Sequence, residues 1–210
     1  NLSVHTEMFV DAYLQLFKAG KITGNKSLNK GKMTYTFAMG SQELYDWIDG
    51  NQMMQVGPVD YVNDVDVISK NEKMISINSC LQVDLFGQVN SESAGLQHIG
   101  GTGGQLDYVM GAFKSEGGKS FLCLPSTRKR NDGTRESLIR ATLPQGSIVS
   151  TPRSGVHYIV TEYGAVNLKG KNTYERAELL VSIAHPDFRE ELMEEAKKMG
   201  IWKVSSKVQK

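Results

Sequence analysis

The chain of 210 residues contains no long apolar run. A membrane-spanning helix needs about 18 or more consecutive apolar residues, and an export signal needs a charged, apolar and small-residue leader. Because neither pattern occurs, we expect a cytoplasmic protein without a membrane segment. The mean hydropathy of −0.33 and the 40% share of hydrophobic residues are typical of a globular protein with a core of its own.

Cysteine is scarce, and the residue spacing of metal sites is missing. The two cysteines, Cys80 and Cys123, each lie in an apolar strand-like run and form no C-x-x-C pair, so we expect reduced core residues. The four histidines are scattered, without the close spacing of a metal-binding pair. The sequence therefore predicts no metal site.

Charge of one sign is not in excess either. With 24 basic and 23 acidic residues the formal net charge is +1, and only the loop at Arg128 and the tail at 203–210 are locally basic. A nucleic-acid-binding protein usually has a broad basic face, whereas short basic runs are more often solvated loops or chain ends. We therefore expect no nucleic-acid partner.

Helix-like and strand-like patterns alternate along the chain. Apolar residues at helical spacing predict a helix from about Thr6 to Ala19, with Gly20 as its C-terminal stop. A strand is expected at 33–40 and a helix at 41–50, where Ser41 fits the N-cap position. Further predicted elements are an extended piece at 53–62, a short helix at 64–71, strands within 73–90 broken at Gly87, a helix at 105–115 and a strand at 119–126.

The remaining segments complete an α/β pattern. β-rich runs at 137–152 and 157–164 precede two helices at 173–184 and 186–200, the second with Pro186 in its first turn. Alternating helices and strands indicate an α/β fold, with a mixed sheet flanked by helices. Since no internal repeat or long linker is visible, we expect one domain over residues 1–210.

Seven segments, in order, resemble a known family. They are HTEMFVDAYLQLFKAGKITG, TFAMGSQELYDWI, VDYVNDVDVIS, SINSCLQVDLFGQVNSES, GGTGGQLDYVMGA, VTEYGAVNLKGK and AHPDFREEL. Together they resemble the C-terminal half of the acetyl-CoA hydrolase/transferase family, and most closely its 4-hydroxybutyrate and butyryl-CoA:acetate CoA-transferases. The similarity runs from about Ser3 to about Leu192.

The resemblance implies a two-part enzyme. Members of this family have two similar α/β halves, so residues 1–210 are expected to form a CoA-transferase-like C-terminal catalytic domain. The N-terminal half, which carries a CoA-binding glycine loop, is absent from this sequence and is expected as its partner. Because relatives are commonly dimers, a homodimer is expected as well.

The resemblance also implies a reaction. CoA passes between acetate and a short acid such as butyrate or 4-hydroxybutyrate, so acyl-CoA and carboxylates are substrates, and neither a metal nor a bound cofactor is needed. A glutamate attacks the acyl-CoA thioester and becomes a glutamyl-CoA thioester, which a second carboxylate resolves in a ping-pong sequence.

Three residues are expected to be catalytic because they match the family's motifs. Glu7, in HTE, is the nucleophile; taken alone, it would serve the dipole of the predicted helix. Asn63 matches a hydrogen-bond donor beside the acyl group, and its alternative is a turn or N-cap role for Asn63 or Asp64. Glu162 matches an active-site glutamate that orients the nucleophile, and its alternative is an exposed residue at a strand end.

Four further residues are expected to contact CoA. Gly104 matches a residue that lines the thioester site and donates to its oxyanion, and Gly100 and Gly101 would contact CoA nearby. Without the resemblance, this glycine cluster is simply a tight turn. Leu81 matches another position near CoA, although an apolar strand residue is more simply part of the core.

Two departures from the family's pattern stand near these positions. Gln82 occupies a position where many relatives have Glu, so it cannot act as a carboxylate. The basic loop around Arg128 and Lys129 is longer than in some relatives and is a candidate contact for a CoA phosphate.

Three functions are compatible with the sequence. The first is a CoA-transferase, which we favour because Glu7, Asn63, Gly104 and Glu162 are all present. The second is an acyl-CoA hydrolase, in which water resolves the same intermediate. The third is a non-catalytic half that docks to a separate first-half chain.

Overall fold

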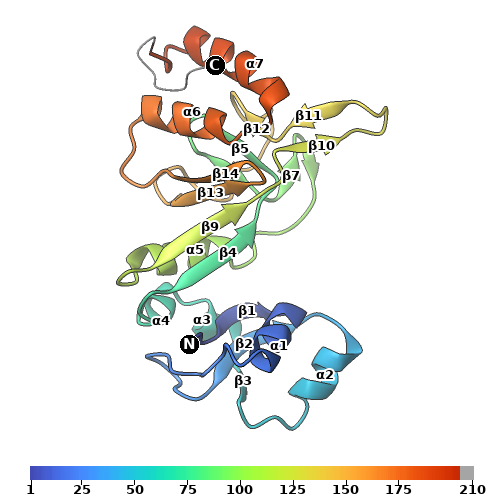
Figure 1. The fold of residues 1–210 in the computed structure, drawn as a ribbon, viewed down its shortest axis with the longest axis vertical. Coiled ribbons are helices and arrows are strands. Elements are labelled where there is room, and N and C mark those ends of the chain that lie inside the picture. Colours follow the sequence, from blue (N-terminus) through green and yellow to red (C-terminus); the bar gives the residue numbers. More distant parts are fainter. Residues whose placement is uncertain (204–210) are drawn as a thin grey trace. The chain divides into compact units, whose positions relative to one another are not determined.

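The computed structural model describes residues 1–203, which form two compact units. Unit 1 consists of Asn1–Met74 and Met110–Gly118, and unit 2 consists of Ile75–Val109 and the described part of Lys119–Lys210. Helices and strands alternate along the chain, so the predicted α/β class is confirmed (Figure 1). The predicted basic tail lies, after Lys203, outside the described residues.

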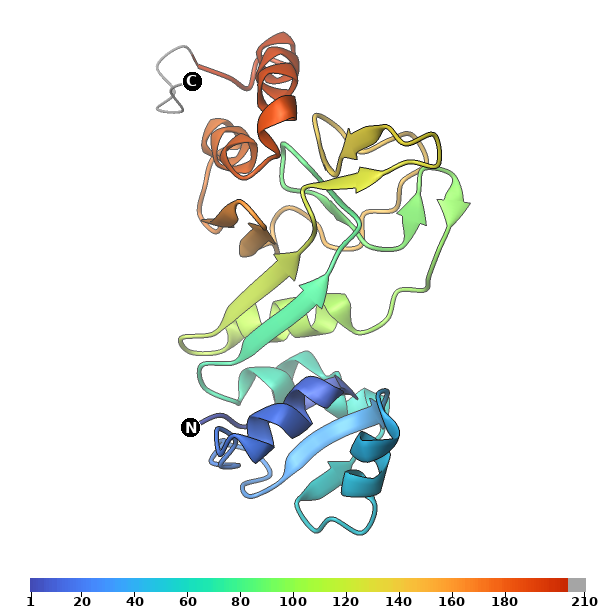
Figure 2. The same ribbon diagram turned by 45° about the vertical axis from the view of Figure 1, so that its right-hand side comes forward.

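Unit 1 is built on three parallel strands (Figure 2). Its elements are β1 (His5–Phe9), α1 (Asp11–Lys18), β2 (Met33–Ala38), α2 (Gln42–Ile48), β3 (Met54–Val56), α3 (Val59–Val62) and α4 (Val65–Ser69). The strand order is β1-β2-β3, and the chain between consecutive strands contains α1 or α2. This is the crossover connection that parallel pairing requires.

One apolar core holds these elements together. Phe9 and Met33 from the strands are fully buried together with Leu14 of α1 and Leu44 of α2. Each such side chain contributes roughly 1.5–3 kcal/mol when it leaves water. The core therefore fixes the strands that carry the N-terminal motif.

The N-terminal motif begins as a strand, so the prediction of a helix from Thr6 was wrong. β1 pairs with β2, and α1 starts only at Asp11, whose carboxylate lies in the first helical turn. A short apolar run fits either period, and here the pairing with a distant strand decides the conformation. The predicted stop is confirmed, since Gly20 follows the helix with φ +66°. Glu7 therefore lies in a strand and cannot serve a helix dipole.

Unit 2 contains the mixed sheet that the sequence predicted. Its strands are β4 (Ile75–Ser79), β9 (Lys119–Cys123), β13 (Tyr158–Thr161) and β14 (Gly164–Asn167), in the order β14-β13-β9-β4. β4, β9 and β13 are parallel, and β14 is antiparallel to β13. The carboxyl ends of three strands thus meet at one edge of the sheet.

Three helices and several short strands complete the described chain. They are β5 (Gln82–Asp84), β6 (Val89–Asn90), β7 (Ser93–Ala94), β8 (Gln97–His98), α5 (Gln105–Lys114), β10 (Thr127–Lys129), β11 (Arg135–Ser137), β12 (Ile139–Arg140), α6 (Thr173–Ser182) and α7 (Pro186–Lys198). The predicted break at Gly87 is confirmed, because Gly87 lies between β5 and β6, but a second interruption at Cys80 and Leu81 was not predicted. Pro186 occupies the first turn of α7 as predicted.

A second apolar core belongs to unit 2 and includes fully buried Leu122, Ile159 and Leu180. Cys80 is part of it as a free thiol, whose pKa is raised to about 12 by burial and by the nearby Cys123. Such a thiol is chemically inert. Across residues 1–203, no helix has both the length and the apolarity that crossing a bilayer demands.

Candidate active site

Glu7 lies in the middle of β1, in unit 1, and its side chain is partly buried. β1 pairs with β2 in the same register before and after Glu7: Thr6 lies opposite Tyr35, and Met8 lies opposite Phe37. Glu7 and Thr36 are the residues left between these pairs, so they lie opposite each other. Parallel strands run about 4.8 Å apart, which makes Thr36 the cross-strand neighbour of Glu7.

Asn63 is brought to the same unit by a short helix that packs against β1 and β2. Nε2 of His5 lies 2.8 Å from the carbonyl oxygen of Val62, the last residue of α3, and Asn63 is the C-cap of that helix. Asn63 is 8% exposed, and its Oδ1 is buried with no hydrogen-bond partner among the described residues. The N-cap role belongs to Asp64, whose carboxylate accepts from Val67 N–H at the start of α4. The side chain of Asn63 therefore does not make the N-cap bond of α4.

Two buried basic groups stand beside the start of β1. Lys26 donates to the Val4 carbonyl and to Thr34 Oγ1, each at 2.7 Å, and burial lowers its pKa to about 8. Burial also lowers the pKa of His5, an effect that the Val62 bond opposes and the Lys26 charge reinforces. At neutral pH the lysine is therefore mainly charged and the histidine mainly neutral, and the positive field favours anions near this strand.

In unit 2, two of the predicted residues lie at the carboxyl ends of parallel strands. Leu81 follows β4, and Glu162 follows β13 in the tight turn to β14. The connection from β4 to β9 includes β5–β8 and α5, and it returns the chain to the amino-terminal end of the sheet. Gly104 immediately precedes α5. Open α/β sheets bind ligands at the carboxyl ends of their strands.

Glu162 is exposed, yet its carboxylate is held in one orientation. Ser126, which is fully buried after β9, donates its backbone N–H to Oε2 at 2.8 Å and its hydroxyl to Oε1 at 2.6 Å. Desolvation raises the pKa of Glu162, but the Ser126 hydroxyl, backbone N–H groups and the charge of His185 outweigh it, so that the pKa lies below its usual value. Glu162 is thus an oriented anion at an exposed strand end, and its active-site role stays a prediction beside the alternative.

The glycine-rich loop leads into α5 as expected. The Gly104 carbonyl accepts the N–H of Tyr108 at 3.0 Å, the first hydrogen bond of the helix, so the loop ends at a helix N-terminus. Added side chains at Gly100 or Gly101 would meet nothing within 4 Å. The Gly100 N–H donates to the carbonyl of Glu92 at 3.1 Å, which ties down the loop entrance. The geometry suits an anion at the backbone N–H groups, and the CoA contacts of these glycines stay a prediction.

Leu81 is partly buried and is not a member of either apolar core. Its backbone N–H donates to the Asn90 carbonyl at 2.9 Å. The simpler interpretation, a core residue, is therefore not supported, and a CoA contact stays a prediction. The neighbouring Gln82 is 5% exposed and accepts from Asn90 Nδ2 at 3.4 Å.

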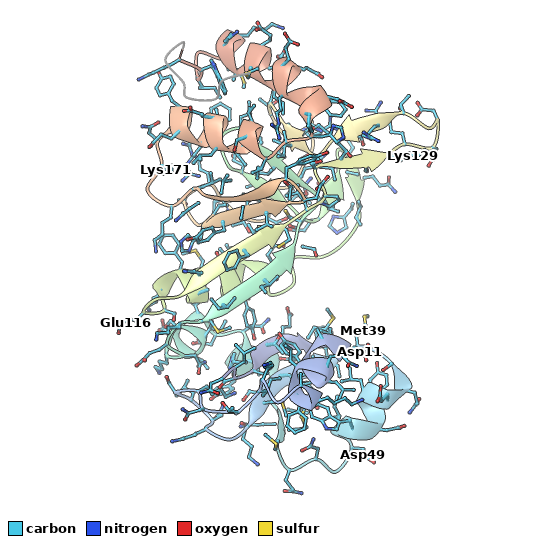
Figure 3. The ribbon with its side chains drawn as sticks, in the orientation of Figure 1. Asp11, Met39, Asp49, Glu116, Lys129 and Lys171 are labelled. Atoms are coloured by element: carbon cyan, nitrogen blue, oxygen red, sulfur yellow. The ribbon has the colours of Figure 1, made fainter. Side chains whose placement is uncertain are left out.

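The basic loop is partly neutralised by one acid. Glu136, which is 5% exposed, pairs with Arg128, Arg130 and Arg140. Burial raises the pKa of Glu136, but these arginines, Arg130 first, lower it to about 2. Lys129, on the β10–β11 hairpin, is exposed (Figure 3). Arg128 is therefore already engaged, and a phosphate contact in this loop stays a prediction.

Asp84, another acidic residue of the motifs, is buried and hydrogen-bonded within its own turn. Asp84 is 1% exposed and accepts hydrogen bonds from Gln88 and from the backbone of Phe86. Burial raises the pKa of Asp84 in spite of these bonds. Within residues 1–203, no three His, Cys, Asp or Glu side chains are grouped so that they could hold a metal ion.

The candidate residues fall into two sets, one in each unit. Unit 1 brings Glu7 and Asn63 to neighbouring elements, and unit 2 contains Leu81 after β4, the glycine loop before α5 and Glu162 after β13. Sequence reasoning missed Ser126 and Thr36. The position of Ser126 at the end of a predicted strand is the one signal that pointed to it, because residues at strand ends form sites in α/β folds.

Comparison with known proteins decides the family. Residues 40–196 match the model of the acetyl-CoA hydrolase/transferase C-terminal domain. The chain belongs to this family. The resemblance inferred from the seven segments is thereby confirmed.

Several family members are similar over almost the whole chain. A Syntrophomonas wolfei protein named "Probable butyrate:acetyl-CoA coenzyme A-transferase" is 55% identical over 99% of this chain and 46% of its own length. The butyryl-CoA:acetate CoA-transferase of Anaerostipes caccae is 50% identical over 99% of this chain and 47% of its own length. The 4-hydroxybutyrate coenzyme A transferase of Clostridium kluyveri is 50% identical over 94% of this chain and 46% of its own length. The chain thus spans less than half the length of these relatives.

Solved structures of family members share the fold. RipA from Yersinia pestis aligns with a TM-score of 0.88 at 44% identity, covering 95% of this chain and 44% of that one. The 4-hydroxybutyrate CoA-transferase from Porphyromonas gingivalis aligns with a TM-score of 0.79 at 42% identity, covering 95% and 46%. The predicted CoA-transferase-like architecture is therefore confirmed.

Proposed function

We propose that residues 1–210 are the C-terminal catalytic domain of a CoA-transferase that moves CoA between acetate and butyrate or 4-hydroxybutyrate. The relatives at 50–55% identity are named as enzymes of these substrates. Proteins named acetyl-CoA hydrolases are only 27–28% identical. The transferase is therefore preferred over the hydrolase.

The reaction that we propose begins with Glu7. Its carboxylate attacks the thioester carbonyl carbon of butyryl-CoA, the C–S bond breaks, and a mixed anhydride and CoA thiolate result. The thiolate then attacks the glutamyl carbon, and butyrate leaves as the carboxylate. Acetate repeats both steps in reverse on the glutamyl-CoA thioester, so acetyl-CoA is released and Glu7 is regenerated. CoA is a substrate, and no permanently bound cofactor takes part.

The other candidate residues have supporting roles. Asn63 would donate its amide to the acyl oxygen, and the backbone N–H of Gly104 would stabilise the oxyanion of each tetrahedral intermediate. Gly100, Gly101 and Leu81 would contact CoA. Glu162, an oriented anion whose pKa lies below its usual value, would align the nucleophile in its ionised form.

One observation carries this proposal. Glu7 is a partly buried carboxylate in a parallel strand, with Asn63 on the adjoining helix end, in a chain whose 50–55% identical relatives are named CoA-transferases. Partial burial removes water from a carboxylate nucleophile and so favours attack on a thioester.

The test is to trap the glutamyl thioester in the longest natural polypeptide that contains these residues. After incubation with butyryl-CoA and no acceptor acid, intact-mass measurement and peptide mapping should locate a CoA adduct on the Glu7 peptide. Glu7→Gln should abolish both adduct and turnover, because the amide is nearly isosteric but a poor nucleophile. Glu116→Gln, an exposed control in unit 1, should retain both. Transfer at the wild-type rate in Glu7→Gln would exclude Glu7 as nucleophile.

The same preparation separates the remaining alternatives. Release of free CoA without acetate at the full rate would favour the hydrolase. We also propose that the N-terminal half of the enzyme is required, that the enzyme is a homodimer, and that it acts in the cytoplasm. An adduct on the 210-residue chain alone would contradict the first of these, and light scattering and cell fractionation test the others.

A further inference from the structure

Thr36 is a threonine of β2 that lies opposite Glu7. The pairs on either side, Thr6 with Tyr35 and Met8 with Phe37, fix this placement. Paired residues of a parallel sheet project from the same face, so the Thr36 hydroxyl belongs to the face on which the Glu7 carboxylate stands.

The Thr36 hydroxyl is buried and has no hydrogen-bond partner among the described residues. Buried hydroxyls are nearly always bonded, because a hydroxyl that loses water without gaining a partner destabilises the fold. Thr34, two residues earlier in the same strand, follows this rule. Its hydroxyl accepts from Lys26 at 2.7 Å and from Asn29 at 3.3 Å, and donates to Gln55 at 3.3 Å.

A second unsatisfied group lies on the helix that packs against the same strands. Oδ1 of Asn63 is buried without a partner, and α3, which ends at Asn63, contacts both β1 and β2. Two unsatisfied polar groups on elements that adjoin Glu7 indicate a polar ligand at this place, because unpaired groups of this kind concentrate at functional sites.

We propose that the Thr36 hydroxyl contacts substrate and donates a hydrogen bond to an oxygen of the carboxyl or thioester group that reacts at Glu7. The inference rests on the proposed function and adds a residue to it. A hydroxyl suits this place, because it stabilises a developing oxyanion without forming a salt bridge that would weaken the carboxylate nucleophile.

Thr36→Val separates this role from a structural one, since valine keeps the shape and removes only the hydroxyl. The melting temperature should be unchanged or higher, because the substitution breaks no internal hydrogen bond and removes a buried hydroxyl that has no partner among the described residues. The rate of CoA adduct formation on Glu7 should fall about 100- to 1,000-fold, which is the typical loss when one hydrogen-bond donor to an oxyanion is removed. Thr36→Ser should restore most of the rate.

Thr6→Val is the matched control. Thr6 is next to Glu7 in β1, but its hydroxyl already donates to the Met8 carbonyl at 3.1 Å. This variant should form the adduct at nearly the wild-type rate. A result in which both valine variants slow the reaction equally would assign the loss to the strand rather than to the Thr36 hydroxyl, and would overturn the inference.

The failures of the two proposals are distinguishable. Normal adduct formation by Thr36→Val, with an adduct in the wild type, counts against Thr36 alone. A lowered melting temperature, with the rate recovered on cooling, would make Thr36 structural. Absence of an adduct in the wild-type enzyme would remove the proposed function and with it this inference.

Discussion

At the scale of single residues, the hydrogen bonds between Ser126 and Glu162 have a measurable consequence. Ser126→Ala removes the hydroxyl bond and leaves the backbone N–H bond. The hydroxyl is the largest of the contributions that lower the pKa of Glu162, so this pKa should rise in the variant. If ionised Glu162 aligns the nucleophile, the acidic limb of the pH profile for CoA transfer should move to higher pH, and the plateau above it should change little.

Two controls make this prediction specific. Ser137→Ala removes another buried hydroxyl, which donates to the Ile139 carbonyl, and should leave the pH profile in place. In a Glu162→Gln background, Ser126→Ala should have no further effect on the acidic limb, because the titrating group is gone. An unshifted limb in the single variant would return Ser126 to a purely structural role.

The sequence identified some of these residues and not others, for a physical reason. Glu7, Asn63 and Glu162 stand in contiguous motifs, so a resemblance was enough to single them out. Thr36 and Ser126 gain their meaning from partners that lie far away in the chain: the strand register places Thr36 opposite Glu7, and Ser126 bonds a residue 36 positions later. No local pattern contains this information.

At the scale of elements, the N-terminus of α6 is the clearest case of sequence dictating structure. Asn172 accepts from the N–H of Glu175 at 3.0 Å, and the Glu175 carboxylate accepts from the N–H of Asn172 at 2.9 Å. This reciprocal pair satisfies two donors that the helix itself leaves unpaired.

Asn172→Ala should therefore lower the free energy of unfolding by about 1 kcal/mol. Urea titration followed by far-ultraviolet circular dichroism measures the difference. Asn172→Ser, which keeps a capping oxygen, should lose much less. If both variants are as stable as the wild type, the cap contributes nothing and α6 is fixed by packing alone.

Helices with strong end signals were predicted correctly, whereas β1, which has none, was not. The Ser41 N-cap of α2 is observed, with its hydroxyl accepting from Leu44 N–H at 3.3 Å, and Pro186 starts α7. β1 was predicted as a helix, because its five residues are too few to reveal a period and its partner strand begins 24 residues after β1 ends. Local propensity is a weak guide to secondary structure where pairing with a distant strand decides the conformation.

At the scale of the whole molecule, the candidate residues are divided between two units with separate cores. The expectation of one domain rested on the absence of a linker in the sequence. Linkers are visible in composition, but compact units that share a helix are not, because α5 contributes Gln105–Val109 to unit 2 and Met110–Lys114 to unit 1. Hydrogen exchange can determine whether the two units unfold together.

Separate cores predict separate local stability. Leu14→Ala empties a fully buried position in the core of unit 1 and should cost about 2–5 kcal/mol there. Hydrogen exchange followed by mass spectrometry should then show lost protection in peptides of α1, β1 and β2, with β13 and α6 unchanged. Leu180→Ala, at a fully buried position of α6, should give the reverse pattern. Equal loss in both units from either variant would show that residues 1–203 unfold as one cooperative body, in which case a mutation in either core would disturb Glu7 and Glu162 alike.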